Sequence, residues 1–329
     1  MHIGPVRCAG LAREGAVVVR DQAGSGGPVI EVTGLVKHFG ELVAVDRLSF
    51  EVGEGEVFGF VGPNGAGKTT TVECVAGLRV PDAGIVRVCG LDPVADRDRI
   101  RHLVGMQLQS ATLPDRLKVW EAVRLYASFY PRPVDEEALL KDVGLDDRRS
   151  RRFGKLSGGE KQRLSLALAL IGNPRIAILD ELTTGLDPQA RRDTWALIER
   201  IRDRGATIVL VTHYMEEAER LCDRVAVIAS GSLIALDSPA GLVKRAGDTE
   251  RIAFRPSADV EEALLTVLPG VTGVARDGRR MVVTGTGDVA SQVIAALTAR
   301  HVQAMELRVD RPTLDDAFLV LTGHPSDET

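Results

Sequence analysis

A glycine-rich segment near the start of the chain has the composition and spacing of a phosphate-binding loop. The segment from Gly62 to Thr69 reads GPNGAGKT, which fits the pattern G-x-x-x-x-G-K-T, and it follows the apolar run Val57–Val61. In a strand–loop–helix unit such glycines let backbone N–H groups converge on phosphate oxygens, and the helix N-terminus adds partial positive charge. We expect Lys68 to reach the β and γ phosphates of a nucleotide and the Thr69 hydroxyl to bind Mg²⁺. An ordinary glycine-rich turn is the alternative, and the Lys-Thr pair at the correct offset argues against it.

Two adjacent acids end a continuous apolar run further along the chain. The segment Arg175–Glu181 reads RIAILDE, which places Asp180 and Glu181 at the carboxyl end of a predicted buried strand. Ligands bind at that edge of an open α/β sheet. A nucleotide site needs one carboxylate to hold Mg²⁺ and one to orient the attacking water. Because neighbouring residues on a strand point to opposite faces, the chain must turn at Glu181 for both acids to serve one site. An acidic turn after a strand is the common alternative.

A third segment, Leu156–Arg163, reads LSGGEKQR and predicts a second phosphate site. Ser157 and Glu160 have the spacing of a capping box, so we expect a helix to start at Ser157. Gly158 and Gly159 would expose backbone N–H groups at the positive end of that helix.

Composition and charge narrow the class of protein. The formal net charge of −5 over 329 residues argues against a general nucleic-acid binder, and we expect no nucleic-acid partner. No apolar run approaches the roughly 18–20 residues that a membrane-spanning helix needs, and the N-terminal segment lacks an apolar signal core. We therefore expect a cytoplasmic protein. The scattered cysteines, which form no C-x-x-C pair, favour a reducing compartment; they are Cys8, Cys74, Cys89 and Cys222.

Patterning along the chain predicts an α/β fold with two domains. Residues 1–28 are expected to form a flexible extension. A nucleotide-binding domain is expected over 29–245, beginning with an antiparallel β subdomain and including a helical subdomain at about 96–172. Residues 246–323 follow the order β-α-β-β-α-β, which predicts a small ferredoxin-like α+β domain. Residues 324–329 would form a tail.

The motifs occur in the order of the ATP-binding cassette (ABC) family, which the chain resembles over about Val29–Val243. The glycine loop matches Walker A, RIAILDE matches Walker B, and LSGGEKQ matches the family signature. Gln109 looks like the Q-loop glutamine, Thr184–Asp187 like the D-loop, and His213 like the switch histidine. Phe39 lies where the family stacks an aromatic ring on adenine. The resemblance implies a P-loop NTPase core of the ABC type.

The resemblance also implies ATP and Mg²⁺ as ligands and gives roles to the motif residues. Glu181 would polarise the attacking water as the general base, His213 would sense the γ phosphate, and Gln109 would link the site to the helical subdomain. Mg²⁺ would be held by Thr69, Gln109 and Asp180. The signature would act on the ATP of a second copy, which implies a homodimer with two-fold symmetry. The residues expected to contact ATP are Phe39, Gly62, Pro63, Asn64, Gly65, Ala66, Gly67, Lys68, Thr69, Thr70, Ser157, Gly158, Gly159, Glu160 and Asp187.

Three features leave alternatives open. Leu182 stands where the family usually has proline, which loosens the turn but removes no ligand. Gln107 competes with Gln109 for the Q-loop role, and the spacing to the following LKV favours Gln109. The basic cluster Asp146–Lys155 is expected to be a solvated face, with a membrane-facing patch as the alternative.

The C-terminal third indicates which branch of the family the chain resembles. The segment Asp237–Arg245, the small α+β domain and the closing helix Arg311–Gly323 are similar to the drug-resistance (daunorubicin-resistance-like) ATPases of ABC-2 type exporters. The resemblance implies an ATP-hydrolysing subunit, peripheral on the inner face of the cell membrane, that powers efflux of a hydrophobic compound through a separate permease. The alternative is a soluble ABC ATPase that remodels a macromolecular complex.

Overall fold

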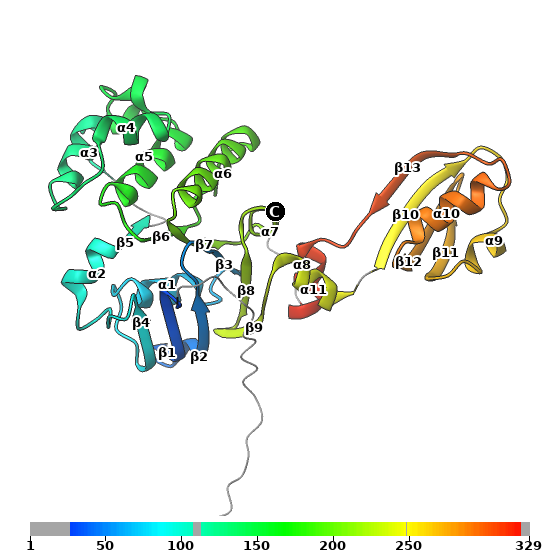
Figure 1. The fold of residues 1–329 in the computed structure, drawn as a ribbon, viewed down its shortest axis with the longest axis horizontal. Coiled ribbons are helices and arrows are strands. Elements are labelled where there is room, and N and C mark those ends of the chain that lie inside the picture. Colours follow the sequence, from blue (N-terminus) through cyan, green and yellow to red (C-terminus); the bar gives the residue numbers. More distant parts are fainter. Residues whose placement is uncertain (1–26, 108–112, 248, 324–329) are drawn as a thin grey trace, which may run out of the picture.

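Three β-sheets organise the chain, which this computed structural model describes over residues 27–107, 113–247 and 249–323 (Figure 1). The first sheet is antiparallel and has the order β2-β1-β4. Apolar and polar side chains alternate along β1, so that Ile30 and Val32 are buried and their neighbours point outward. The strands of this sheet are β1 (Ile30–Phe39), β2 (Leu42–Val52) and β4 (Ala83–Val88).

The second sheet has six strands in the order β5-β6-β7-β3-β8-β9. Its first five strands are parallel and β9 is antiparallel to β8. Buried, β-branched side chains fill the central strands because helices cover parallel sheets on both faces. The strands are β3 (Val57–Val61), β5 (Val104–Gln107), β6 (Ile176–Asp180), β7 (Thr207–Thr212), β8 (Arg224–Ala229) and β9 (Ser232–Asp237).

Three phenylalanines connect the first sheet to the second. The ring centroid of Phe50 on β2 lies 5.6 Å from that of Phe58 and 5.0 Å from that of Phe60, both on β3. All three rings are buried. This aromatic contact fixes the antiparallel sheet over the strand that leads into the glycine loop.

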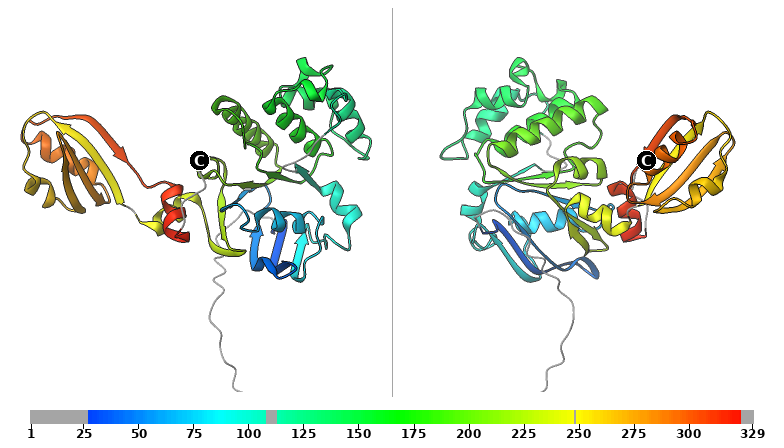
Figure 2. Two further views of the ribbon diagram at one scale, coloured as in Figure 1. Left: turned by 180° about the vertical axis from the view of Figure 1, so that it is seen from behind. Right: turned by 45° about the vertical axis from the view of Figure 1, so that its right-hand side comes forward.

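Helices surround the sheets and gather at one end of the nucleotide-binding domain, where α3, α4 and α5 lie together in both views of Figure 2. None of the helices in the described ranges is both long and apolar enough to span a bilayer. The helices of this domain are α1 (Lys68–Val75), α2 (Arg97–Leu103), α3 (Val119–Ala127), α4 (Glu136–Asp142), α5 (Gly158–Leu170), α6 (Pro188–Asp203), α7 (Met215–Leu221) and α8 (Pro239–Ala246), with 3-10 turns at Asp146–Arg148 and Phe153–Lys155.

The third sheet belongs to the C-terminal α+β unit and has the order β11-β12-β10-β13, which is the strand order of a ferredoxin-like fold. After this unit the chain returns, and α11 packs beside α8 and α7 (Figure 1). The predicted fold class is therefore confirmed. The elements are β10 (Thr249–Pro256), α9 (Glu262–Thr266), β11 (Val271–Asp277), β12 (Arg280–Thr286), α10 (Val289–Thr298), β13 (Ala304–Asp310) and α11 (Leu314–Thr322).

One strand was missed by the sequence analysis, which expected helical structure throughout about 96–172. The four residues of β5 pair in parallel with β6, with Val104 opposite Ile176. A segment this short shows no periodicity of its own. Its Gly105 lies so close to α5 that a Cβ atom there would be 2.0 Å from the carbonyl oxygen of Ala169. The strand is set by long-range pairing and by this close approach.

Candidate active site

The glycine loop between β3 and α1 is closed in by backbone on two sides. Gly62 has φ +154° and Gly67 has φ +96°, values that favour glycine. A Cβ atom on Gly62 would be 2.1 Å from the carbonyl oxygen of Ile228, and one on Gly67 would be 2.2 Å from that of Ala44. Both positions therefore require glycine for the loop to take this shape.

Lys68 and Thr69 lie at the start of α1 and face the inside of the loop. The ammonium of Lys68 donates to the carbonyl oxygens of Gly62, at 2.6 Å, and Pro63, at 2.9 Å, although its side chain is nearly buried. The Thr69 hydroxyl donates to Oδ2 of Asp180 at 3.0 Å. The structure thus brings the loop and the predicted Mg²⁺ carboxylate together.

The turn that both acids require is present at the end of β6. Asp180 is the last residue of the strand, and Glu181 adopts a left-handed backbone with φ +51°, while its N–H donates to the Val211 carbonyl at 2.8 Å. Oε1 of Glu181 lies 3.3 Å from Nδ1 of His213, which follows β7. A left-handed conformation is uncommon outside glycine, and such strain concentrates at functional sites.

Asp180 has the properties of a ligand that needs a cation. Its Oδ1 is buried and has no hydrogen-bond partner within the part of the chain that the structure describes. Burial raises the pKa of Asp180 to about 6, the Thr69 hydrogen bond lowers it, and the neighbouring Glu181 raises it. A carboxylate and a hydroxyl are hard oxygen donors of the kind that Mg²⁺ takes alongside substrate phosphates. The residues present therefore fit Mg²⁺.

The raised pKa of Asp180 predicts how the metal-free protein responds to pH. A carboxyl whose folded-state pKa is raised adds stability below its unfolded pKa and loses it as pH rises through about 6. Asp180→Asn removes the ionisable group and with it this loss of stability. The free energy of unfolding of the variant minus that of the parent should therefore be about 1–2 kcal/mol larger at pH 8 than at pH 5.

Denaturant unfolding in excess chelator measures this difference. The exposed Asp98 supplies the control, since Asp98→Asn should show no such pH dependence. If the unfolding free energies of Asp180→Asn and the parent changed in parallel from pH 5 to pH 8, the pKa of Asp180 would not be raised in the folded protein.

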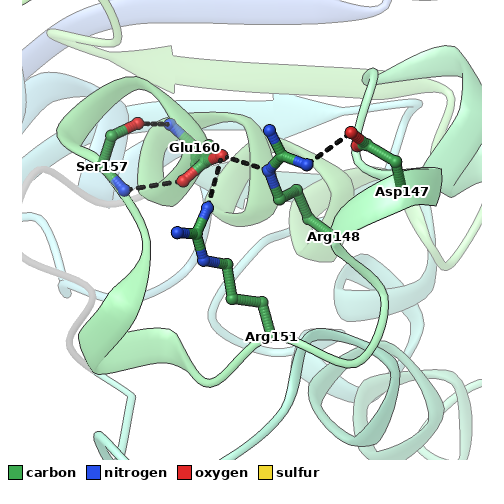
Figure 3. Close-up of polar contacts among 5 residues, drawn as sticks. All are labelled: Asp147, Arg148, Arg151, Ser157 and Glu160. Carbon is green, nitrogen blue, oxygen red and sulfur yellow. Dashed lines mark hydrogen bonds and ion pairs between the residues drawn. The ribbon is translucent and has the colours of Figure 1, made fainter.

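The signature segment starts α5 through the capping box that the sequence predicts. The Ser157 hydroxyl accepts from the Glu160 N–H at 3.2 Å, and Oε2 of Glu160 accepts from the Ser157 N–H at 2.7 Å (Figure 3). A Cβ atom on Gly158 would meet nothing within 4 Å. The N-terminus of α5 is thus open beside Gly158.

The other predicted site residues lie at several places. Phe39 ends β1 with 42% of its surface exposed and has the Arg79 guanidinium 5.0 Å from its ring centroid. Asp187 caps α6, accepting from the N–H groups of Gln189 and Ala190 at 3.0 Å.

Gln109 lies outside the described residues, whereas Gln107 is buried at the carboxyl end of β5. The remaining members of the glycine loop, Pro63, Asn64, Gly65, Ala66 and Thr70, lie between β3 and α1 or in the first turn of α1.

Sequence reasoning missed a set of contacts behind His213. The ring of Tyr214 lies 4.1 Å from that of His213, and the Arg191 guanidinium lies 4.4 Å from the Tyr214 ring. Arg191 is one turn after Asp187 on α6, so these contacts connect the helix after the predicted D-loop to the pair formed by His213 and Glu181. The one feature of the sequence that points to a role for Tyr214 is its position directly after His213.

Most of the basic cluster Asp146–Lys155 is exposed, as predicted for a solvated face, but the sequence analysis missed the contacts that two of its arginines make. Nε of Arg148 donates to Oε1 of Glu160 at 2.7 Å, and Nη1 of Arg151 lies 3.5 Å from the same oxygen (Figure 3). Two of its arginines therefore contact a signature residue. The signal in the sequence was an acid directly after LSGG, close to an excess of arginine.

Comparison with known proteins agrees with this geometry. The family described as "ABC transporter" matches residues 45–184. The Nod factor export ATP-binding protein I of Rhizobium sp. (strain N33) is 38% identical over 91% of this chain and 98% of its own length. The daunorubicin/doxorubicin resistance ATP-binding protein DrrA of Streptomyces peucetius is 36% identical over 91% of this chain and 94% of its own length.

Solved structures give the same result for the nucleotide-binding domain. An ATP-binding subunit of an ABC transporter superposes with a TM-score of 0.60 at 27% identity, covering 66% of this chain and 92% of that one. A dimeric ATP-binding cassette in a post-hydrolysis state, bound to ADP and phosphate, superposes with a TM-score of 0.59 at 25% identity, covering 64% of this chain and 98% of that one. The phosphate-binding loop, the paired acids and the signature helix thus occur in a chain that is similar to exporter ATP-binding proteins along nearly their whole length, and the chain belongs to the ABC transporter family as an ATP-hydrolysing subunit.

Proposed function

We propose that this chain powers an ABC-2 type exporter as a pair of identical subunits, at the cytoplasmic face of the membrane, and drives efflux of a hydrophobic compound through a separate permease. The observation that carries the proposal is the extent of the similarity: it covers 91% of this chain in both exporter relatives, beyond the 64–66% covered by the solved cassettes. The additional similarity includes part of the C-terminal third. A soluble ATPase that remodels a complex is not favoured by these relatives.

Each residue of the candidate site has a role in binding ATP. Lys68 would exchange the carbonyl oxygens of its own loop for β and γ phosphate oxygens, and Phe39 offers an exposed ring for adenine. Asp180 and Thr69, with Gln109, would hold Mg²⁺, which when bound neutralises phosphate charge. The signature Ser157, Gly158, Gly159 and Glu160, and Asp187, would face the nucleotide of the second copy.

Hydrolysis then depends on the turn at Glu181. Its carboxylate would accept a proton from water as the water oxygen bonds to the γ phosphorus, and the bond to the bridging oxygen of ADP breaks. His213 lies 3.3 Å from Glu181 and would orient that carboxylate toward the γ phosphate. Loss of the γ phosphate removes the group that joins the two copies, so hydrolysis would open the pair.

A recess beside α2 and α3 is the expected contact with the permease. It has a volume of about 360 Å³ and is lined by Arg101, His102, Phe129 and Tyr130. Phe129 is 62% exposed and the neighbouring Leu125 on α3 is 48% exposed. An exposed aromatic ring with the Arg101 guanidinium in the same recess suits a short amphipathic segment of a partner protein.

Capture of the partner tests the proposal. Tagged Glu181→Gln protein, expressed in the source cell with ATP and solubilised gently, should bring down a polytopic membrane protein in stoichiometric amount. Adding Phe129→Glu should abolish capture, while Val267→Glu, a matched change at a 78% exposed position directly after α9, should not. Recovery of a homodimer without a membrane protein, or with ribosomes or DNA, would contradict the export role and leave the ATPase chemistry intact.

A further inference from the structure

Glu160 brings a negative charge to the end of α5 that would receive phosphate. It is the third residue of the helix and its side chain is nearly buried, with 8% of its surface exposed. As a member of the capping box it stabilises the helix start. For an incoming triphosphate, however, the same carboxylate is repulsive, and a nearly buried charge is screened less than an exposed one. The signature needs Glu160 for its shape and needs its charge compensated.

Two arginines supply this compensation from the preceding segment. Arg148 donates to Oε1 of Glu160 at 2.7 Å and Arg151 lies 3.5 Å away, while Oε2 remains bonded to the Ser157 N–H (Figure 3). Burial raises the pKa of Glu160, but the Ser157 N–H and the two arginines outweigh it, so its pKa lies below the ordinary value. Arg148 also pairs with Asp147. The formal charges of these two arginines and of the two acids, Glu160 and Asp147, sum to zero.

The backbone holds these arginines in place. The carbonyl of Arg151 accepts from the Val119 N–H at 3.0 Å, and that of Arg149 accepts from the Trp120 N–H at 3.1 Å, which ties the segment to the first turn of α3. Nη1 of Arg149 points elsewhere, to Oε1 of Glu137 on α4 at 2.7 Å. The segment is therefore a fixed connection between α3 and the signature, and only some of its arginines serve Glu160.

We propose that Arg148, assisted by Arg151, is a positioning residue that neutralises and orients Glu160 so that the start of α5 can accept the triphosphate of the second copy. This inference rests on the proposed pairing of two copies. Loss of Arg148 should affect pairing of two copies but not ATP binding by one copy, whereas a general loss of structure would change both. Binding of ATP by a single copy uses the glycine loop and does not involve Arg148. Pairing of two ATP-loaded copies uses the signature and depends on it.

Sedimentation of the full chain in the hydrolysis-deficient Glu181→Gln background, with saturating Mg·ATP, tests this separation. Arg148→Ala should weaken ATP-dependent pairing roughly 10- to 100-fold, the effect of one uncompensated charged hydrogen bond. ATP affinity at low protein concentration should not change. The matched control is Arg149→Ala, which removes a neighbouring arginine that pairs with α4 and should leave pairing at the parental level.

A second substitution distinguishes charge compensation from structural support. Glutamine can replace glutamate in a capping box without carrying charge, so Glu160→Gln added to Arg148→Ala should restore most of the lost pairing. Failure of this rescue, or a parallel loss of ATP affinity in Arg148→Ala, would overturn the inference in favour of a structural role. Undiminished pairing of Arg148→Ala would overturn the inference about Arg148 and leave the two-copy arrangement standing. Failure of the Glu181→Gln parent to pair with ATP would overturn the two-copy arrangement itself.

Discussion

Glu181→Gln is expected to reduce ATP turnover by roughly 10²–10⁴-fold, the usual contribution of a general base, while ATP binding persists. Glutamine has the shape of glutamate, so it can keep the left-handed backbone at φ +51° and the approach to Nδ1 of His213. It cannot accept the proton of the attacking water. The loss should therefore fall on kcat, with little change in the affinity for ATP.

Single-turnover hydrolysis and an ATP-binding titration on the same preparation measure the two quantities. Glu216→Gln is the matched control, because Glu216 is an exposed acid on α7 that lies near His213 in sequence, and its turnover should equal that of the wild type. If Glu181→Gln turned over ATP at the wild-type rate, Glu181 would not be the base.

Lys68→Ala is expected to weaken ATP binding by roughly 10- to 100-fold or more, because it removes charged hydrogen bonds to phosphate. The Lys68 ammonium bonds to two carbonyl oxygens of its own loop and its side chain is nearly buried. The positive charge is thus held at the loop. The position lets a phosphate replace the carbonyl oxygens without large movement of the side chain.

Titration with a fluorescent ATP analogue in the presence of Mg²⁺ measures this affinity, with thermal unfolding run alongside. Lys141→Ala, on the exposed side of α4, removes the same side chain outside the site and should bind ATP as the parent does. Wild-type affinity in a folded Lys68→Ala protein would exclude Lys68 from the phosphate site.

Local features of the site could be predicted because their causes are local in sequence. The capping box of Ser157 and Glu160 needs four consecutive residues, and the structure contains both of its hydrogen bonds. The strand–loop–helix around Lys68 likewise follows from residue order and the glycine spacing. The need for a turn at Glu181 followed from strand alternation, and its φ of +51° supplies the turn.

Features fixed by distant parts of the chain could not be predicted in the same way. Strand β5 exists because Val104–Gln107 pairs with β6, about seventy residues later in the chain, and because Gly105 allows close contact with α5. The contact of the Arg191 guanidinium with the Tyr214 ring joins α6 to the start of α7, two segments that lie apart in the sequence. The arginines before the signature lie on a largely exposed face, as charge clusters usually do. That Arg148 and Arg151 also point to Glu160 depends on how the folded chain places this segment beside α5.

The most direct test of two copies sharing each ATP is to mix two inactive variants. Lys68→Ala lacks the phosphate lysine but has an intact signature. Gly158→Asp keeps the lysine and adds a repulsive carboxylate where a Cβ meets nothing within 4 Å, so the fold should tolerate it. Each mixed pair then contains one intact site built from Lys68 of one copy and Gly158 of the other. We predict that the mixture recovers about a quarter of wild-type ATP turnover, since half of randomly formed pairs are mixed and each has one intact site of two. Tagged mixed pairs that form and remain as inactive as either variant alone would contradict the shared site.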